Sequence, residues 1–109
     1  MVKTELEIKA IISRYTTEIE QLGVRPQKIL LYGSYATGNA REDSDIDLVV
    51  ISEDFKDMNI RERLEILGIA AGRVFEPIEA MGYTPAEIAA DKKGTFIGEI
   101  LERAEKQQF

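Results

Sequence analysis

The spacing of apolar positions predicts two long helices in the chain. Between residues 3 and 22 and again between residues 60 and 74, apolar side chains recur every three or four positions, as on one face of an amphipathic helix. Gly23 ends the first helix, and Asn59 with Glu62 forms a capping box that begins the second. The predicted buried faces consist of Ile8, Ile11, Ile12, Tyr15, Ile19 and Leu22, and of Ile60, Leu64, Leu67, Ala71 and Val74.

Three shorter apolar segments have the composition of strands. Lys28–Tyr32 is a short buried segment, and Asp45–Ser52 is the segment richest in β-branched residues. Phe75–Tyr83 is the third, and because its Pro77 cannot donate a ladder hydrogen bond we expect it at an edge of the sheet.

The remaining segments predict short helices. Ser34–Ala40 should form a helical turn or two, and the capping box of Thr84 and Glu87 with Pro85 opens a helix that runs through Ala90. A last helix carries the apolar stripe Phe96, Ile97, Ile100, Leu101 and Ala104. This order of elements predicts an α+β fold, in which helices flank a small mixed three-stranded sheet and cover mainly one face.

Length, composition and charge narrow the class of protein. With 109 residues, 44% of them hydrophobic and 31% charged, we expect residues 1–109 to form one globular domain. No apolar segment is long enough to span a membrane and the first residues are charged, so we expect a cytoplasmic protein. The net charge of −6 argues against a long nucleic-acid surface.

The candidate chemistry lies in residues 33–47. Gly33 and Ser34 form the turn after the first strand, where backbone N–H groups can bind an anion. Asp45 and Asp47 are two positions apart and therefore leave one face of the second strand. The chain has no cysteine and no histidine, so a metal held by these carboxylates would be a hard ion such as Mg²⁺ or Mn²⁺.

Two other phosphate or metal motifs do not fit. No G-K-[ST] follows the glycine turn, which excludes a P-loop. A calcium-binding loop would begin with acidic residues at alternate positions, as at Asp43, Asp45 and Asp47. Such a loop needs Gly at its sixth position and Glu at its twelfth, where this chain has Leu48 and Asp54, so a calcium loop is excluded.

Together, the turn and the aspartate pair carry a family resemblance. The pattern G-S-x-A-x-G followed by S-D-I-D-L-V-V resembles the signature of the DNA polymerase beta-like nucleotidyltransferase superfamily, in particular its minimal nucleotidyltransferase branch. The matching residues are Gly33, Ser34, Ala36, Gly38, Arg41, Ser44, Asp45, Ile46, Asp47 and Leu48. The resemblance implies the nucleotidyltransferase fold, with the third strand beside the strand that carries the aspartates.

A two-metal site needs a third carboxylate, for which the third strand offers Glu76 and Glu79. Their opposite parity allows only one of them on the face of the aspartates. In the family the third carboxylate precedes a Y-T-P-x-E segment, here Tyr83–Glu87, and this favours Glu79, although the family more often has Asp there.

The resemblance also implies roles for the remaining site residues. Asp45, Asp47 and Glu79 would bind two Mg²⁺ ions, and Glu79 would help to deprotonate an acceptor hydroxyl. The backbone of Gly33 and Ser34 would hold the phosphates of a nucleoside triphosphate. Arg41 and Ser44 would also contact the nucleotide, and Arg41 could replace the arginine that the family commonly has at the position of Thr37; otherwise it is an ordinary surface residue.

The resemblance suggests a partner as well. Minimal nucleotidyltransferases are commonly paired with HEPN-domain toxins, so we expect an antitoxin that transfers AMP from ATP to a tyrosine of such a partner. One alternative is a weak or inactive nucleotide-binding antitoxin that acts by masking its partner. Another, transfer to a small-molecule alcohol, has no residues here to specify the acceptor.

Overall fold

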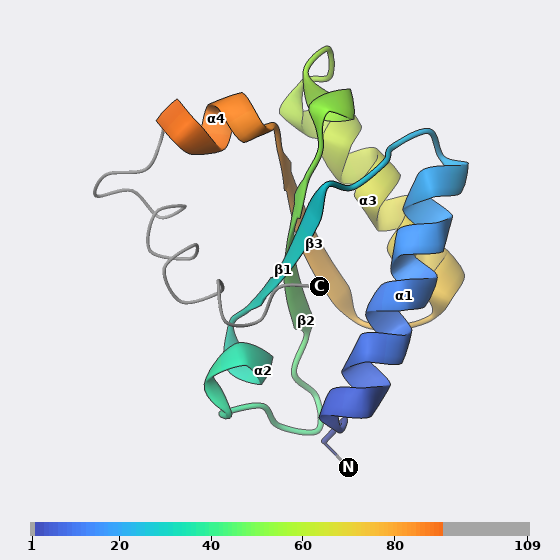
Figure 1. Ribbon diagram of the computed structural model, residues 1–109. Coiled ribbons are helices and arrows are strands. Elements are labelled where there is room, and N and C mark those ends of the chain that lie inside the picture. Colours follow the sequence, from blue (N-terminus) through green and yellow to red (C-terminus); the bar gives the residue numbers. More distant parts are fainter. Residues whose placement is uncertain (1, 91–109) are drawn as a thin grey trace.

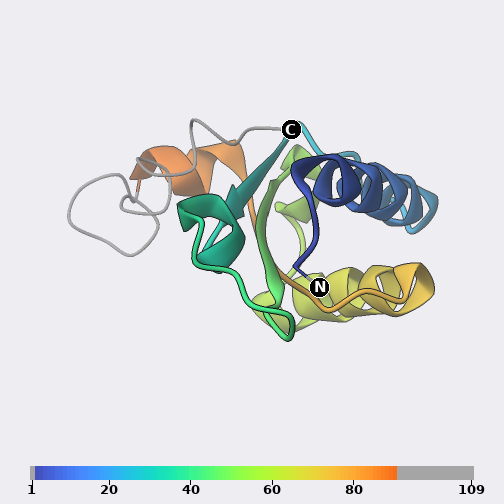
Figure 2. The same ribbon diagram turned by 90° about the horizontal axis from the view of Figure 1, so that it is seen from below.

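The computed structural model describes residues 2–90. Three strands form one mixed sheet in the order β1-β2-β3, in which β1 and β2 are antiparallel and β2 and β3 are parallel. Helices α1 and α3 lie side by side on one face of the sheet (Figure 1), and the view from below shows the same layering (Figure 2). The elements are α1 (Glu5–Gln21), β1 (Lys28–Tyr32), α2 (Ser34–Thr37), β2 (Ile46–Ile51), the 3-10 helix η1 (Glu53–Phe55), α3 (Ile60–Val74), β3 (Ile78–Tyr83) and α4 (Pro85–Ala90).

The prediction of an α+β fold with a small mixed sheet is therefore confirmed. The predicted order of elements holds as far as α4, and the expected last helix lies outside the described residues. Among residues 2–90, no helix has both the length and the apolar composition that a membrane crossing requires.

Helix α1 follows its sequence pattern closely. The side chain of Thr4 accepts a hydrogen bond from the Glu7 N–H at 3.1 Å, and the Glu7 carboxylate accepts one from the Thr4 N–H at 2.9 Å. The helix ends before Gly23, whose φ of 96° suits glycine best. Its predicted apolar face is buried at Ile8, Ile11, Ile12, Tyr15 and Ile19.

Helix α3 begins at the predicted capping box but buries a different face from the predicted one. Ile60 and Leu64 were expected in the core and are instead 73% and 50% exposed. Arg63 and Ala70 are buried together with Leu67 and Val74, so the contact face is rotated by about one residue. The reason is that Arg63 finds hydrogen-bond acceptors inside the fold, which allows a charged residue to take a core position.

The first strand begins at Lys28 as predicted, but the predicted starts of the second and third strands were too early. Asp45 lies just before β2, which begins at Ile46. Phe75 ends α3 in the left-handed region, with φ at 59°, and is 93% exposed. Pro77 precedes β3 and its carbonyl accepts a hydrogen bond from the Ile46 N–H at 2.8 Å. The predicted edge position of the third strand is confirmed, because β3 pairs only with β2 in the described sheet.

The two faces of the sheet have different surroundings. On the face covered by α1 and α3, alternate strand residues such as Ile46, Leu48 and Val50 join the main core. The opposite face carries a smaller cluster that is centred on Leu30, Val49 and Ile51. Tyr32, Met81, Tyr83 and Ile88 pack against this smaller cluster.

Arg63 connects α3 to the far end of β3. Its guanidinium donates to the carbonyls of Phe55 at 2.8 Å and Gly82 at 3.2 Å, and its Nε donates to the Met58 carbonyl at 3.0 Å. It also pairs with both oxygens of Glu87, at 2.6 and 3.1 Å. This buried guanidinium therefore holds η1, α3, β3 and α4 together.

Candidate active site

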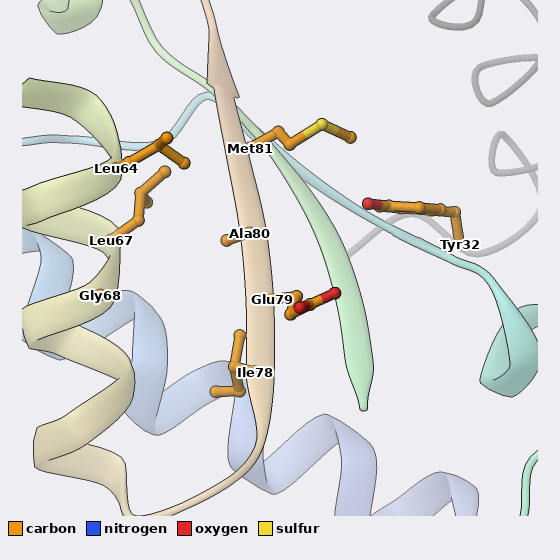
Figure 3. A pocket seen from close by; sticks show the side chains of 8 residues that line it. All are labelled: Tyr32, Leu64, Leu67, Gly68, Ile78, Glu79, Ala80 and Met81. Carbon is orange, nitrogen blue, oxygen red and sulfur yellow. The ribbon is translucent and has the colours of Figure 1, made fainter. Parts of the chain in front are cut away.

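Sheet register places three polar side chains in one row across the sheet. Tyr32 of β1 is the partner of Asp47 in the antiparallel ladder, and Glu79 of β3 is the partner of Asp47 in the parallel ladder. Register partners in adjacent strands leave the same face. Figure 3 shows Glu79 and Tyr32 extending toward one another from β3 and β1. The row therefore lies on the face opposite α1 and α3.

The carboxylates of this row lie close enough together to repel one another and to raise the pKa values of their neighbours. Burial, the charges of Glu79 and Asp45, and a hydrogen bond with Glu79 together raise the pKa of the Asp47 carboxyl to about 6, and burial is the largest of these causes. Burial, followed by the charges of Asp47 and Glu79, raises the pKa of the Tyr32 phenol to about 12. Proton or cation binding near Asp47 would relieve this repulsion.

The structure separates the two candidates for the third carboxylate. Glu79 lies next to Asp47 through the strand register. Glu76 lies before β3 and forms ion pairs with Lys3 and Arg14, each at 3.6 Å. Glu79, and not Glu76, is thus brought next to Asp47.

Asp45 is close to this pair but is not part of the sheet. It is exposed and lies in the loop that enters β2, although its charge contributes to the raised pKa of Asp47. Within residues 2–90, no three acidic side chains stand close enough to hold one metal ion jointly. The donor chemistry nevertheless fits a hard divalent cation, because Asp47 and Glu79 offer adjacent carboxylate oxygens whose repulsion such an ion would cancel.

The Gly33 turn is in direct contact with the acidic row. Gly33 has φ of 73° and ψ of −152°, a conformation that is essentially restricted to glycine. A Cβ atom at Gly33 would come within 2.2 Å of Asp47 Oδ2. The backbone of the turn therefore lies against the Asp47 carboxylate and leaves no room for a side chain at residue 33.

Replacing Gly33 with Ala is expected to lower the free energy of unfolding by about 2–3 kcal/mol, because the methyl group meets both the φ strain and the Asp47 carboxylate. Urea unfolding of the variant measures this loss. Gly68→Ala is the matched control, since no atom lies within 4 Å of a Cβ there. A Gly33→Ala variant as stable as the Gly68→Ala variant would contradict the geometry.

The other predicted nucleotide contacts lie in the surrounding loops. Ser34 begins α2, and the N–H groups of Ser34 and Tyr35 belong to its first turn, where no earlier helical carbonyl accepts them. Ser44 Oγ accepts a hydrogen bond from the Arg41 N–H at 2.7 Å, and the Arg41 carbonyl accepts one from the Ser44 N–H at 3.0 Å. Ser44 therefore shapes the loop that leads to Asp45, and exposed Arg41 lies at the start of that loop.

An open cavity of about 360 Å³ borders the acidic row (Figure 3). Glu79 and Tyr32 line it together with mainly apolar residues of α3 and β3, among them Leu64 and Met81. Its volume is in the range of small ligand pockets. Tyr32 was missed by the sequence interpretation, although its even spacing from Leu30 and its place just before Gly33 could have put it on the site face.

Comparison of the sequence with models of known protein families identifies the family of this chain. The family model described as a nucleotidyltransferase domain matches residues 12–104, which include the turn, the aspartates and Glu79. The chain belongs to the nucleotidyltransferase domain family. The resemblance that the sequence motif indicated is thereby confirmed.

The nucleotidyltransferase domain is similar in sequence to two proteins whose names mention adenylyl transfer. The protein adenylyltransferase MntA of Thermococcus cleftensis is 39% identical over 66 residues, which is 56% of this chain and 65% of the relative. A Methanocaldococcus jannaschii protein that is provisionally named a protein adenylyltransferase is 40% identical over 48 residues, 44% of this chain and 55% of the relative. The matched part thus spans less than two thirds of either relative's length.

A solved structure shares the fold of the nucleotidyltransferase domain. A Sulfolobus solfataricus protein provisionally named a nucleotidyltransferase superposes with a TM-score of 0.53. The superposition covers 83% of this chain and 84% of that one, at 20% sequence identity. This similarity supports the fold assignment.

Proposed function

We propose that this nucleotidyltransferase domain is a Mg²⁺-dependent protein adenylyltransferase, which transfers AMP from ATP to a hydroxyl group of another protein. The observation that carries the proposal is the pairing of Asp47 with Glu79 beside the Gly33 turn. Family membership supports nucleotidyl transfer, and the names of the two relatives support a protein acceptor.

In this proposal the acidic residues would bind the metal ions and accept a proton. Asp47 and Glu79, with Asp45 from the adjacent loop, would hold the Mg²⁺ ions, two of which are expected per site. Bound Mg²⁺ would supply Lewis-acid polarisation of the α-phosphate and charge neutralisation of the leaving pyrophosphate. Glu79 would accept the proton of the acceptor hydroxyl.

The glycine turn and the following loop would orient the nucleotide. Backbone N–H groups at Gly33 and Ser34, with the Ser34 hydroxyl, would bind the β- and γ-phosphates. Arg41 and Ser44 would border the same nucleotide from the loop before β2. These roles hold the α-phosphate near Glu79 for in-line attack.

We further propose that the acceptor is a tyrosine of a HEPN-domain toxin, so that the domain acts as an antitoxin in a toxin–antitoxin system. The net charge of −6 disfavours a nucleic-acid acceptor, and the described residues contain one small sheet with its helices. The protein adenylyltransferase names of the two relatives also favour an acceptor on a partner protein.

A second candidate is a nucleotide-binding antitoxin that masks its partner without transfer. It is favoured by the exposed position of Asp45 and by the lack of a preformed three-carboxylate group among residues 2–90. Under this alternative the acidic row has no catalytic role.

An experiment with labelled ATP distinguishes adenylyl transfer from masking of the partner. The domain is incubated with Mg²⁺ and its HEPN-domain partner, in parallel with ATP labelled at the α-phosphate and ATP labelled at the γ-phosphate. Adenylyl transfer labels the partner from α-labelled ATP only. Neutralisation of the partner without any covalent label supports masking and contradicts transfer.

A further inference from the structure

Only one of the four tyrosines is in strand register with the acidic row. Tyr15 is buried and donates to the Leu67 carbonyl at 2.9 Å. The hydroxyl of Tyr35 accepts from the Lys3 N–H at 3.4 Å, and that of Tyr83 contacts the Met81 sulfur at 3.9 Å. Tyr32 is the tyrosine that is paired in register with Asp47.

Within residues 2–90, the Tyr32 hydroxyl has no hydrogen-bond partner and is not fully buried. No hydrogen bond to it occurs among residues 2–90, while no fully buried side-chain polar atom there lacks a partner. Its oxygen must therefore reach solvent. The ring crosses from β1 toward β3, and Tyr32 and Glu79 line the same cavity (Figure 3).

Tyr32 lies on the same sheet face as the carboxylate that would take the proton of an acceptor hydroxyl. In the proposed reaction the acceptor oxygen must lie near Glu79, which takes its proton, and near the α-phosphate of a nucleotide held at the Gly33 turn. Tyr32 directly precedes Gly33 in the chain, and Asp47 lies between Tyr32 and Glu79 in the sheet. A phenol is also the chemical group that the proposed partner presents.

We propose that Tyr32 is an internal acceptor, so that the protein transfers a nucleoside monophosphate to its own Tyr32 hydroxyl group. This inference rests on the proposed nucleotidyl transfer and extends it to a modification site on the domain itself. The modified side chain would occupy the cavity beside Glu79, where an external acceptor would otherwise place its hydroxyl.

The reaction balances without a further reactant. The Tyr32 O–H bond breaks and its proton passes to the Glu79 carboxylate. The phenolate oxygen forms a bond to the α-phosphorus, and the bond from that phosphorus to the bridging α–β oxygen breaks. Pyrophosphate leaves with that electron pair, and the product is a phosphodiester between Tyr32 and the nucleoside.

The test is mass analysis of the intact full chain after incubation with Mg²⁺ and ATP in the absence of any partner. We expect a mass increase equal to one AMP, located by fragmentation of the segment from residue 29 to residue 41. The Tyr32→Phe variant, which keeps the ring, is expected to lose the adduct. Its circular dichroism and unfolding temperature show whether it remains folded.

Matched variants make the assignment specific. Tyr83→Phe removes a phenol from the same sheet face, and Tyr35→Phe removes the other tyrosine of the same proteolytic segment. Both variants are expected to keep the adduct. An adduct that persists in Tyr32→Phe, or that maps to another residue, overturns the inference.

The outcome also distinguishes this inference from the proposed function. Label on an external partner without any label on the domain itself overturns self-modification and leaves adenylyl transfer standing. Absence of label on both overturns both. An adduct on Tyr32 supports the inference whether or not a partner has been labelled.

Discussion

Replacing Glu79 with Gln is expected to lower the rate of nucleotide transfer by about a hundredfold to ten-thousandfold, the range for loss of a general base. The substitution keeps the size of the side chain and its register position beside Asp47. It removes the negative charge that would bind Mg²⁺ and accept the acceptor proton. Single-turnover transfer of α-labelled AMP to the protein acceptor measures the effect.

Glu76→Gln is the matched control for this prediction. Glu76 has the same charge and lies three residues away, but its carboxylate pairs with Lys3 and Arg14. Its substitution is expected to leave the transfer rate within about twofold, because Glu76 lies before β3 and is not in register with Asp47. Equal losses in both variants would show that the third strand does not supply a specific catalytic carboxylate.

Replacing Arg63 with Ala is expected to lower the free energy of unfolding by about 2–4 kcal/mol, because three backbone carbonyls lose a buried hydrogen-bond donor while the partly exposed Glu87 carboxylate loses its cation. The Arg63 residue is 6% exposed, and its guanidinium stands 5.6 Å from the centre of the Phe55 ring. Without it, the carbonyls of Phe55, Met58 and Gly82 lose their donor, and Glu87 loses its cation. Urea unfolding followed by circular dichroism measures the loss.

Arg61→Ala provides the comparison on the same helix. Arg61 is exposed on α3, so its removal should change the free energy of unfolding by less than about 0.5 kcal/mol. If both arginine variants unfold at the same urea concentration, the guanidinium cluster does not stabilise the fold as its contacts indicate.

The sequence was most informative where local rules operate. Capping boxes at Asn59 and at Thr84 predicted the starts of α3 and α4, and both reciprocal hydrogen-bond pairs are present. Strand parity allowed only one of Glu76 and Glu79 on the face of the aspartates, the family resemblance favoured Glu79, and the register places Glu79 beside Asp47. The capping boxes depend on neighbours within a few residues, and the parity rule depends on a period of two.

The sequence was less informative where long-range contacts decide. The buried face of α3 was mispredicted because the burial of Arg63 depends on acceptors in other elements, among them the Gly82 carbonyl and the Glu87 carboxylate, which lie 19 and 24 residues away in the sequence. Tyr32 was not recognised as a site residue because its partner Asp47 lies fifteen positions later, across an antiparallel pairing. The contact of Gly33 with Asp47 could be seen only in three dimensions.

The raised pKa of Asp47 makes a further prediction about stability and pH. Because this pKa is about 6 in the folded chain and 3.8 in the reference state, the folded form binds the proton more tightly, and ionised Asp47 opposes folding above pH 6. Asp47→Asn should therefore raise stability at pH 7–8 by about 1–2 kcal/mol, a figure reduced for partial solvent screening. The gain should shrink as the pH falls from 6 toward 4, which unfolding curves across this range measure.

The most direct test of the account compares the unfolding temperatures of the wild-type protein and Asp47→Asn with and without Mg²⁺ and ATP at pH 7.5. If the paired carboxylates form a cation-dependent nucleotide site, the variant is the more stable protein without cation and nucleotide. Adding Mg²⁺ and ATP should then raise the unfolding temperature of the wild-type protein above that of the variant. An order of stabilities that Mg²⁺ and ATP leave unchanged would contradict the claim that Asp47 and Glu79 bind the metal–nucleotide complex.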